Sequence, residues 1–392
     1  MPEAVIVTAA RTPIGRAFKG SLISVRPDDM AAFVVRQVLD RLPELDPAEV
    51  EDVYVGAAIG ASEQGYNLGR AVALLAGLPD SVPGATVNRM CASSLQAIRM
   101  AAHAITAGEG EVFIAAGVES VTRTASAGFK LKDANPRFVD EGRDDFVSHY
   151  YLAMGLTAEN VADRYGVTRE AMDVYAKLSQ DRAVAAQAAG VFDREIVPYP
   201  LADGTVVSKD DGPRPGTTLE KLLQIQPAFR PDGRVTAGNA CPLNDGAAAV
   251  VLMSDRRAAE LGIEPLARIL ASAASGVAPE VMGMGPVEAV RKALRRAGMT
   301  IRDVDVVELN EAFAAQVLPV CDELGIDMER QLNPHGGAIA LGHPFGMTGA
   351  RIMTTLLNGL QTLDGAIGLE TMCVGGGQGM AMIVERLGGR WR

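Results

Sequence analysis

Short β-branched runs alternate with helical patterns in two separate parts of the chain. This alternation indicates βαβ units, in which helices connect and cover the strands of a largely parallel sheet. In the first part we expect strands at residues 4–9, 51–58 and 111–117, and helices near residues 28–42, 66–77 and 91–107. In the second part we expect strands at residues 247–253, 267–273, 303–310, 366–372 and 379–385, and helices near residues 286–297, 311–324 and 346–361. The pattern predicts an α/β fold.

The two parts have a similar order of elements, and we interpret them as copies of one unit that pack as a pseudo-dimer. Residues 119–246 between them are richer in charge, proline and glycine, with helical stretches near residues 157–190. This segment is too long to be a simple connection within a compact domain. It is therefore predicted to form an inserted subdomain that takes part in substrate recognition.

Charge and composition exclude several classes of protein. The net charge is −11 and no cluster of Lys and Arg is present, which argues against nucleic acid as a partner. There is neither a signal-peptide pattern nor an apolar run of about 18 residues, so we predict a cytoplasmic protein without a membrane partner. The four cysteines have no CxxC spacing, which argues against a disulfide framework or a metal site.

Cys91 lies in TVNRMCASSLQAIRM, between strand-like residues and a helical pattern. A sulfur at a helix start faces free N–H groups, which favours the thiolate form needed of a nucleophile. The alternative is a small buried hydrophobic residue, and the position alone leaves both open.

His343 lies in NPHGGAIALGHPFGMTGAR, in a turn before a helix expected to begin near Phe345. An imidazole held there can activate a cysteine, although a structural role is equally compatible with the pattern. The sequence constrains the backbone of His335 less than that of His343. We expect the two remaining histidines, His103 and His149, to be structural or solvated.

Asn310 and Cys373 each follow or end a buried strand. Asn310 in ELNEAFAAQ either contributes to a site at the strand's carboxyl end or serves as a helix N-cap. Cys373 in TMCVGGGQGMAM precedes a glycine-rich run that has neither the lysine of a phosphate loop nor a following helix. What remains is a loop whose backbone comes very close to something, with a thiol at its entrance.

In this order, the motifs NRMCASS, NEAFAAQ, GGAIALGHPFGMTGAR and CVGGGQG resemble the thiolase family. The stretches VTAGNACPLNDGAAAVVLMS and AMGLTAENVA extend the resemblance over essentially the whole chain. It implies two similar βαβαβαββ halves packed as five α-β-α-β-α layers with an inserted loop subdomain. Residues 1–118 and 247–266 would form the N-terminal half, residues 119–246 the CoA-binding insertion and residues 267–392 the C-terminal half.

The resemblance also implies a mechanism. Cys91 would accept the acyl group, His343 would take the proton of Cys91, and Cys373 would move a proton on the other substrate. The backbone amides of Cys91 and Gly375 would hold the thioester oxygen, and His343 with a water on Asn310 would hold the enolate oxygen. The implied activity is reversible, CoA-dependent cleavage of a 3-ketoacyl-CoA to acetyl-CoA and a shortened acyl-CoA, in fatty-acid or related lipid degradation.

Coenzyme A and acyl-CoA would be substrates, no cofactor would be bound permanently, and the enzyme would be a homodimer or homotetramer. The residues proposed to contact CoA are Met154, Arg214, Phe229, Ala240 and Cys241. Four positions depart from the common family pattern. Ser94 and His335 do not touch the proposed chemistry, whereas Ala153 and Cys241 leave the acyl-chain preference and the CoA contacts open.

Several alternatives stay open. One is a biosynthetic thiolase that condenses two acetyl-CoA molecules. A ketoacyl synthase or hydroxymethylglutaryl-CoA synthase would generally lack the second cysteine, so Cys373 favours a thiolase. A Cys/His hydrolase would explain neither Cys373 nor the repeat. A silent CoA- or lipid-binding homologue would be expected to have lost Cys91, His343 or Cys373, and all three are present.

Overall fold

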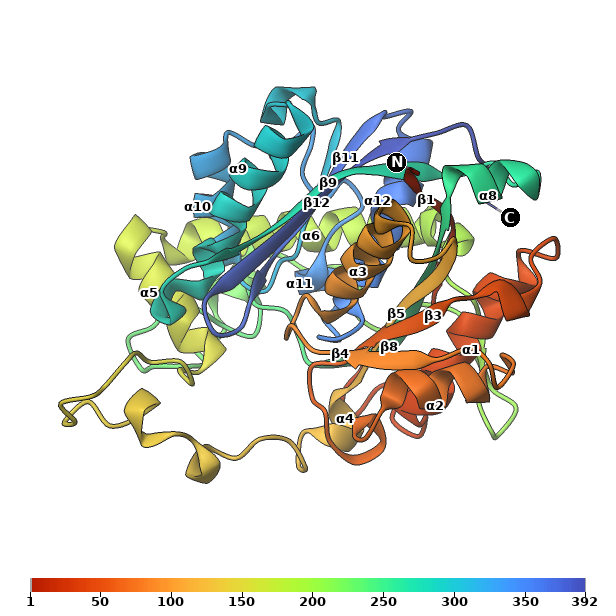
Figure 1. Cartoon of the computed structure of the whole chain (residues 1–392). Coiled ribbons are helices and arrows are strands. Elements are labelled where there is room, and N and C mark those ends of the chain that lie inside the picture. The colour runs from red at the N-terminus through yellow and green to blue at the C-terminus, as the bar shows by residue number, and fades with distance from the viewer. Residues whose placement is uncertain (1, 392) are drawn as a thin grey trace.

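The computed structural model describes residues 2–391, and a mixed β-sheet runs through it in the order β10-β11-β12-β9-β1-β8-β5-β3-β4 (Figure 1). Its strands are β1 (Ala4–Arg11), β3 (Asp52–Gly56), β4 (Gly84–Val87), β5 (Val112–Ser120), β8 (Asn244–Ser254), β9 (Ala267–Gly276), β10 (Val306–Leu309), β11 (Ile367–Val374) and β12 (Gln378–Arg386). The short strand β2 (Gly15–Arg16) pairs with β8. The strands predicted from the sequence are all present, whereas β2 and β4 were not predicted.

The two halves of the sheet have the same topology. In the first half β3 and β5 are parallel while β8 is antiparallel to both β5 and β1, and in the second half β10, β11, β12 and β9 repeat these relations. Leu332 bridges to Val307 at the place that corresponds to β4. The two-copy prediction is therefore confirmed. Two pairs of residues between β1 and β9 join the half-sheets into one.

Helices cover the sheet on its outer faces and fill the space between its halves. They are α1 (Pro27–Asp40), α2 (Leu68–Leu75), α3 (Ser93–Ala107), α9 (Gly285–Ala297), α10 (Ala314–Leu324) and α12 (Thr348–Thr362). Three apolar cores result: α1 and α2 pack on the first half, α9 and α10 on the second, and α3 and α12 lie in the middle core. Because both half-sheets pack on α12, it is buried on all sides from Thr348 to Leu360. This is the predicted five-layered arrangement.

The segment between β5 and β8 contains α4 (Val121–Thr124), α5 (Met154–Tyr165), α6 (Arg169–Ala188), the hairpin β6 (Tyr199–Pro200) and β7 (Val206–Val207), and α7 (Leu219–Leu223). Helices α5 and α6 pack against the second half, next to α10 and the short α11 (Ala338–Leu341), while α8 (Asp255–Glu260) follows β8. Residues 125–153 form an arm that extends from the body (Figure 1). The predicted boundaries of the inserted subdomain stay a prediction, and the β5–β8 pairing continues across them to Ser120 and Asp245.

No helix among residues 2–391 is both long and apolar enough to cross a membrane.

Candidate active site

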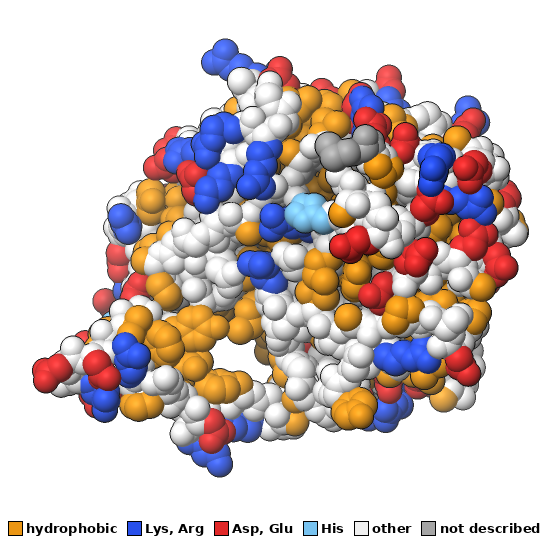
Figure 2. All heavy atoms as spheres, in the orientation of Figure 1, with side chains coloured by type: hydrophobic (Ala, Val, Ile, Leu, Met, Phe, Trp, Pro, Cys, Tyr) orange, Lys and Arg blue, Asp and Glu red, His pale blue; other side chains and the backbone are white. Residues whose placement is uncertain are grey.

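A pocket of about 870 Å³ opens beside Cys91, between the body of the molecule and the arm of residues 125–153. Cys91, Met154 and Gly375 line it, together with aromatic side chains that include Phe129 and Tyr150. In Figure 2 apolar side chains of the arm face the body across an opening. None of the lining residues is Lys, Arg, Asp, Glu or His, so the pocket offers an uncharged environment.

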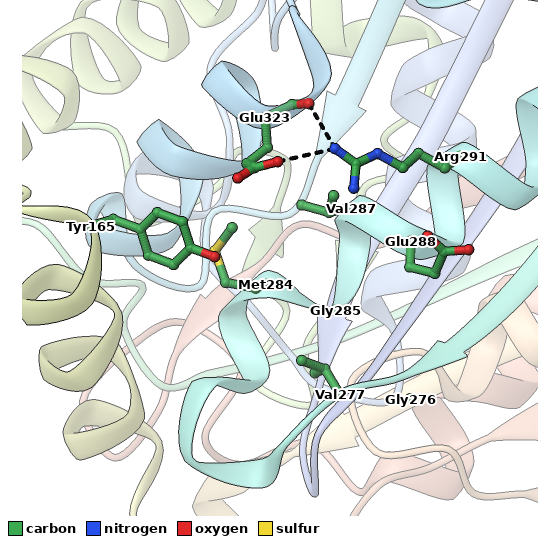
Figure 3. A pocket seen from close by; sticks show the side chains of 9 residues that line it. All are labelled: Tyr165, Gly276, Val277, Met284, Gly285, Val287, Glu288, Arg291 and Glu323. Carbon is green, nitrogen blue, oxygen red and sulfur yellow. Dashed lines mark hydrogen bonds and ion pairs between the residues drawn. The ribbon is translucent and has the colours of Figure 1, made fainter.

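A second pocket, of about 250 Å³, lies among α5, α9 and α10 (Figure 3). Arg291 and Glu323, 3.0 Å apart, form an ion pair at its edge. None of the residues predicted to act in catalysis or to bind CoA lines this pocket, so the pocket beside Cys91 is the candidate active site.

Cys91 is presented by a tight turn between β4 and α3. The preceding residue, Met90, has a φ of 46°, a conformation uncommon for a residue with a side chain. Local hydrogen bonds hold this conformation, since Met90 N donates to Asn88 Oδ1 at 2.9 Å and Ser93 Oγ donates to Met90 O at 2.6 Å. The turn therefore holds strain at the residue beside the sulfur.

Burial raises the pKa of the Cys91 thiol to about 11, although hydrogen bonds from the backbone amides of Gly375 and Cys91 lower it. The expectation that a helix start makes this cysteine a thiolate is therefore wrong. Helix α3 begins only at Ser93, and the loss of hydration outweighs the amide donors. The same amides are nevertheless the two predicted to hold the thioester oxygen, and both face the sulfur.

His343 has a defined tautomer. Its Nδ1 lies 2.6 Å from Thr348 Oγ1, and that hydroxyl donates its own hydrogen to Pro344 O at 2.7 Å. Thr348 can therefore only accept from His343, which places the imidazole hydrogen on Nδ1 and leaves Nε2 unprotonated, as a hydrogen-bond acceptor. Burial, followed by the charge of Arg351, lowers the pKa of His343 to about 3, so the ring is neutral.

The turn that carries His343 is longer than predicted, because α12 begins at Thr348 and not near Phe345. His343 N donates to Asn244 Oδ1 at 3.0 Å, which ties the turn to β8. A Cβ at Gly342 would lie 2.6 Å from the Asn244 side chain, and Gly342 has a φ of +113°. Only glycine fits at this position.

Asn310 lies at the carboxyl end of β10 and is buried. Its Nδ2 is 3.4 Å from His343 Nε2, and its Oδ1 has no hydrogen-bond partner among residues 2–391. The alternative role as a helix N-cap is excluded, because Phe313 occupies the N-cap position of α10. A buried amide oxygen without a partner suits the water that was predicted there.

Cys373 lies within β11, not after it, and pairs with Gly379 of β12. Burial raises its pKa well above the usual value, and the charges of Cys91 and Cys241 raise it further, so the three sulfurs lie close enough to influence one another. The following glycines make the turn of the β11–β12 hairpin. A Cβ at Gly377 would lie 2.2 Å from Val277 O, and Gly377 has a φ of +82°. The predicted close approach of the backbone is therefore to a neighbouring loop.

Two of the five proposed CoA contacts adjoin the pocket or Cys91. Met154 lines the pocket, and Cys241 is packed against the same apolar cluster as Cys373. Ala240 bridges to Phe313, and the Phe229 ring lies edge-on to the Phe313 ring at 6.1 Å. The fifth, Arg214, does not line the pocket, and its backbone N donates to Gln180 of α6.

Two buried carboxylates to which no role was assigned from the sequence hold the site's loops in place. Glu119 of β5 accepts from the backbone amides of Ala58 at 3.0 Å and Gly346 at 2.8 Å, and its charge also contributes to the raised pKa of Cys91. It therefore links the loop after β3 to the loop of His343. The only signal for it in the sequence is a single acidic residue that ends the apolar strand VFIAAGVES.

The second carboxylate is Glu311, which follows Asn310. It accepts hydrogen bonds from Tyr175 at 2.7 Å and Ser179 at 2.6 Å on α6, from Asn333 Nδ2 at 2.9 Å and from Ile339 N at 3.0 Å. A buried carboxylate with four donors is fully satisfied and rigid. It fixes the inserted helix α6 and the glycine-rich segment before His343 to the loop of Asn310.

The chain matches the family "Thiolase, N-terminal domain" over residues 4–256 and the family "Thiolase, C-terminal domain" over residues 263–386. It is 48% identical to a beta-ketoadipyl-CoA thiolase from Pseudomonas putida, over 99% of this chain and 100% of that protein. It is 44% identical to a 3-ketoacyl-CoA thiolase from Bacillus subtilis, over 98% of this chain and 100% of that protein. A crystal structure of the Bacillus anthracis acetyl-CoA acetyltransferase superposes with a TM-score of 0.90 at 41% identity, over 99% of each chain.

These likenesses extend over both halves and the insertion, and they agree with the topology and with the residues gathered around Cys91. The chain therefore belongs to the thiolase family, whose members are acyltransferases that use CoA as a substrate.

Proposed function

We propose that Cys91, His343, Cys373 and Asn310 carry out the thiolase reaction in this chain. Cys91 attacks C3 of a 3-ketoacyl-CoA while His343 Nε2 takes the thiol proton. The C2–C3 bond breaks, its electron pair forms the enolate of acetyl-CoA, and the Cys373 thiol protonates C2. A second CoA gives its thiol proton to Cys373 and attacks the acyl group, and Cys91 leaves and recovers its proton from His343.

The neutral state of both partners supports a proton transfer that accompanies the attack. The pKa of Cys91 is about 11 and that of His343 about 3, so a resting thiolate–imidazolium pair is unfavourable. The oxyanion donors would then contribute most of the stabilisation, with the amides of Cys91 and Gly375 on the thioester oxygen. His343 and a water on Asn310 would hold the enolate oxygen.

The tautomer of His343 gives the first prediction. Thr348→Val removes the acceptor for Nδ1–H, so the proton is free to move to Nε2 and block the base. We expect kcat to fall about a hundredfold, a typical contribution of one general base. Thr348→Ser keeps the acceptor and should retain kcat within about threefold. The rates are measured by thiolysis of acetoacetyl-CoA, and a valine variant as active as the serine variant would contradict the assignment.

For the acyl group, we propose an apolar chain, as in fatty-acid or related lipid degradation. The observation that carries this proposal is the uncharged lining of the pocket beside Cys91. A carboxylate at the end of the acyl chain would lose its hydration there without gaining a cationic partner, at a cost of several kcal/mol.

A second candidate substrate is 3-oxoadipyl-CoA, which ends in such a carboxylate. It is favoured by the names of relatives, which include the beta-ketoadipyl-CoA thiolase of Pseudomonas putida and the 3-oxoadipyl-CoA/3-oxo-5,6-dehydrosuberyl-CoA thiolase of Escherichia coli, 46% identical. A third candidate function is biosynthetic, namely the condensation of two acetyl-CoA molecules.

The first two candidates are separated by a matched pair of substrates. 3-Oxohexanoyl-CoA and 3-oxoadipyl-CoA have six-carbon acyl chains and differ in the terminal methyl or carboxylate. We expect kcat/KM for thiolysis to be at least about ten times higher with 3-oxohexanoyl-CoA, because each 1.4 kcal/mol is a factor of about ten. An equal or higher value with 3-oxoadipyl-CoA would instead support the substrate named for the relatives.

A cytoplasmic location and a homodimeric or homotetrameric assembly stay predictions of the sequence.

A further inference from the structure

Two buried acidic side chains lie side by side behind the catalytic segments. Glu308 of β10 and Glu370 of β11 are direct partners in the parallel pairing of these strands, and their exposed fractions are 1% and 0%. Side chains alternate between the faces of a strand. Because Val306 and Met372, each two residues away, belong to the middle core, both carboxyl groups point to the side of α12.

Arg351 of α12 is the cation whose charge acts on both members of this pair. It is buried, with an exposed fraction of 1%. Yet Nε and Nη1 of Arg351, both carboxyl oxygens of Glu370 and Oε1 of Glu308 have no hydrogen-bond partner among residues 2–391. Burying charged or polar atoms without partners is costly, and ordered water is the usual remedy in a polar interior.

We propose that Glu308, Glu370 and Arg351 enclose ordered water and together form a positioning site that fixes the three catalytic segments relative to one another. Water bridging the guanidinium and the two carboxyl groups would satisfy the five unpartnered atoms. None of the three residues has a role in the thiolase mechanism described above, and none lines the pocket beside Cys91.

The covalent connections explain why this site would act on catalysis. Glu308 lies two residues before Asn310, on the same face, and Glu370 lies in the same strand as Cys373. Arg351 lies in the first turn of α12, the helix that follows the turn of His343. Each of the three segments thus contributes one charged or polar group to a shared cluster, so a change in the cluster shifts all three.

Burial, followed by the charge of Glu308, raises the pKa of Glu370 well above its usual value and so favours its neutral form, in spite of the opposing charge of Arg351. Burial likewise raises the pKa of Glu308 to about 8 against the same opposing charge. The other charged groups that face Glu308 and Arg351 are Glu195, Glu311, Arg182, Arg11 and Asp210. A protonated Glu370 would be both donor and acceptor for water, as glutamine is.

The test compares Glu370→Gln, which keeps a polar group of the same shape, with Glu370→Leu, which removes it. We expect Glu370→Gln to keep kcat within about threefold, and Glu370→Leu to lower kcat at least tenfold with KM for CoA changed less than twofold. Met382→Leu is the matched control, because Met382 pairs with Glu370 across β11 and β12 in the same core. It should keep both constants near those of the wild type.

A measurement besides activity distinguishes a positioning role from a purely structural one. Arg351→Met is the second variant, in case Glu370→Leu does not fold, and it should lower kcat at least tenfold. It should also raise the pH at which the His343 ring titrates in NMR spectra, since Arg351 lowers the pKa of His343. With only four histidines in the chain, that signal can be assigned by substitution.

The proposal is overturned if a folded Glu370→Leu or Arg351→Met variant has a kcat within twofold of the wild type, or if Glu370→Gln loses as much as Glu370→Leu. The assay is thiolysis of acetoacetyl-CoA. The inference therefore rests on the proposed catalytic roles of the thiolase reaction but not on the proposed acyl-chain preference. Failure of the wild type to cleave acetoacetyl-CoA would count against the proposed function, whereas unaffected variants of an active wild type would count against this site alone.

Discussion

Replacing Cys91 by alanine is expected to lower kcat for acetoacetyl-CoA thiolysis by a factor on the order of 10⁶, because removing a nucleophile costs about as much as removing the whole catalytic set. Without the sulfur no acyl-enzyme can form, and the remaining oxyanion donors have no tetrahedral intermediate to stabilise. Cleavage is followed by the loss of absorbance of the magnesium enolate of acetoacetyl-CoA.

Cys241→Ala provides the matched control for that experiment. Cys241 is a second thiol close enough to the Cys91 sulfur for its own pKa to be affected. Cys241 is one of the proposed CoA contacts but has no part in the proposed proton transfers, so kcat of the variant at saturating CoA should stay within about tenfold of the wild type, the range left to altered packing. If Cys91→Ala cleaves at the wild-type rate, or Cys241→Ala is as inactive as Cys91→Ala, the nucleophile has been assigned wrongly.

Replacing Cys373 by alanine is expected to separate the two halves of the reaction. With acetyl-CoA alone, Cys91 should still become acetylated, because that step uses His343 and the backbone amides. Condensation needs a base at C2 of the second acetyl-CoA, so acetoacetyl-CoA formation should fall by a factor of about 10² to 10⁴. Mass spectrometry of the intact chain detects the acetyl group, and the enolate absorbance measures the product.

Cys321→Ala is the control for Cys373→Ala, since Cys321 is also buried and belongs to the same apolar cluster, but has no part in the proposed proton transfers. It should acetylate and condense at nearly wild-type rates. A Cys373→Ala variant that condenses normally would move the proton carrier elsewhere, and one that fails to acetylate would show that Cys373 acts before the proposed step.

The fold was largely predictable because its signal is local. Most strands of the two halves are short apolar runs, many of them next to segments of 3.6-residue periodicity, and each half buries its sheet on both faces. The strand β4 escaped prediction because only one of its four residues is buried, so GATV carries no strong apolar signal. The helix starts at Ser93 and Thr348 were placed too early, since the tight turns before them have no separate signature in the sequence.

Site residues that lie in sequence motifs could be predicted. Residues whose role depends on contacts in the folded molecule could not. Cys91, Asn310, His343 and Cys373 were found from four segments. Cys91 lines the pocket, Cys373 lies close enough to Cys91 for its pKa to be affected, and Asn310 lies beside His343. Glu119 was missed, and Glu311 was placed at the strand end without a role, because an acidic residue in a sequence is expected to be exposed until its donors are known. The pKa of Cys91 was misjudged because burial is a property of the folded molecule.

The repeated topology of the two halves explains why one chain has a single site. Counting from the first residue of each strand, Gly56 at the end of β3 corresponds to Asn310 after β10. A Cβ at Gly56 would lie 2.4 Å from Ser94 N, so the absence of a side chain there admits the start of α3, the helix that follows Cys91. Equivalent positions thus serve different ends: in one half the position carries a polar amide, and in the other it makes room for the segment of the proposed nucleophile.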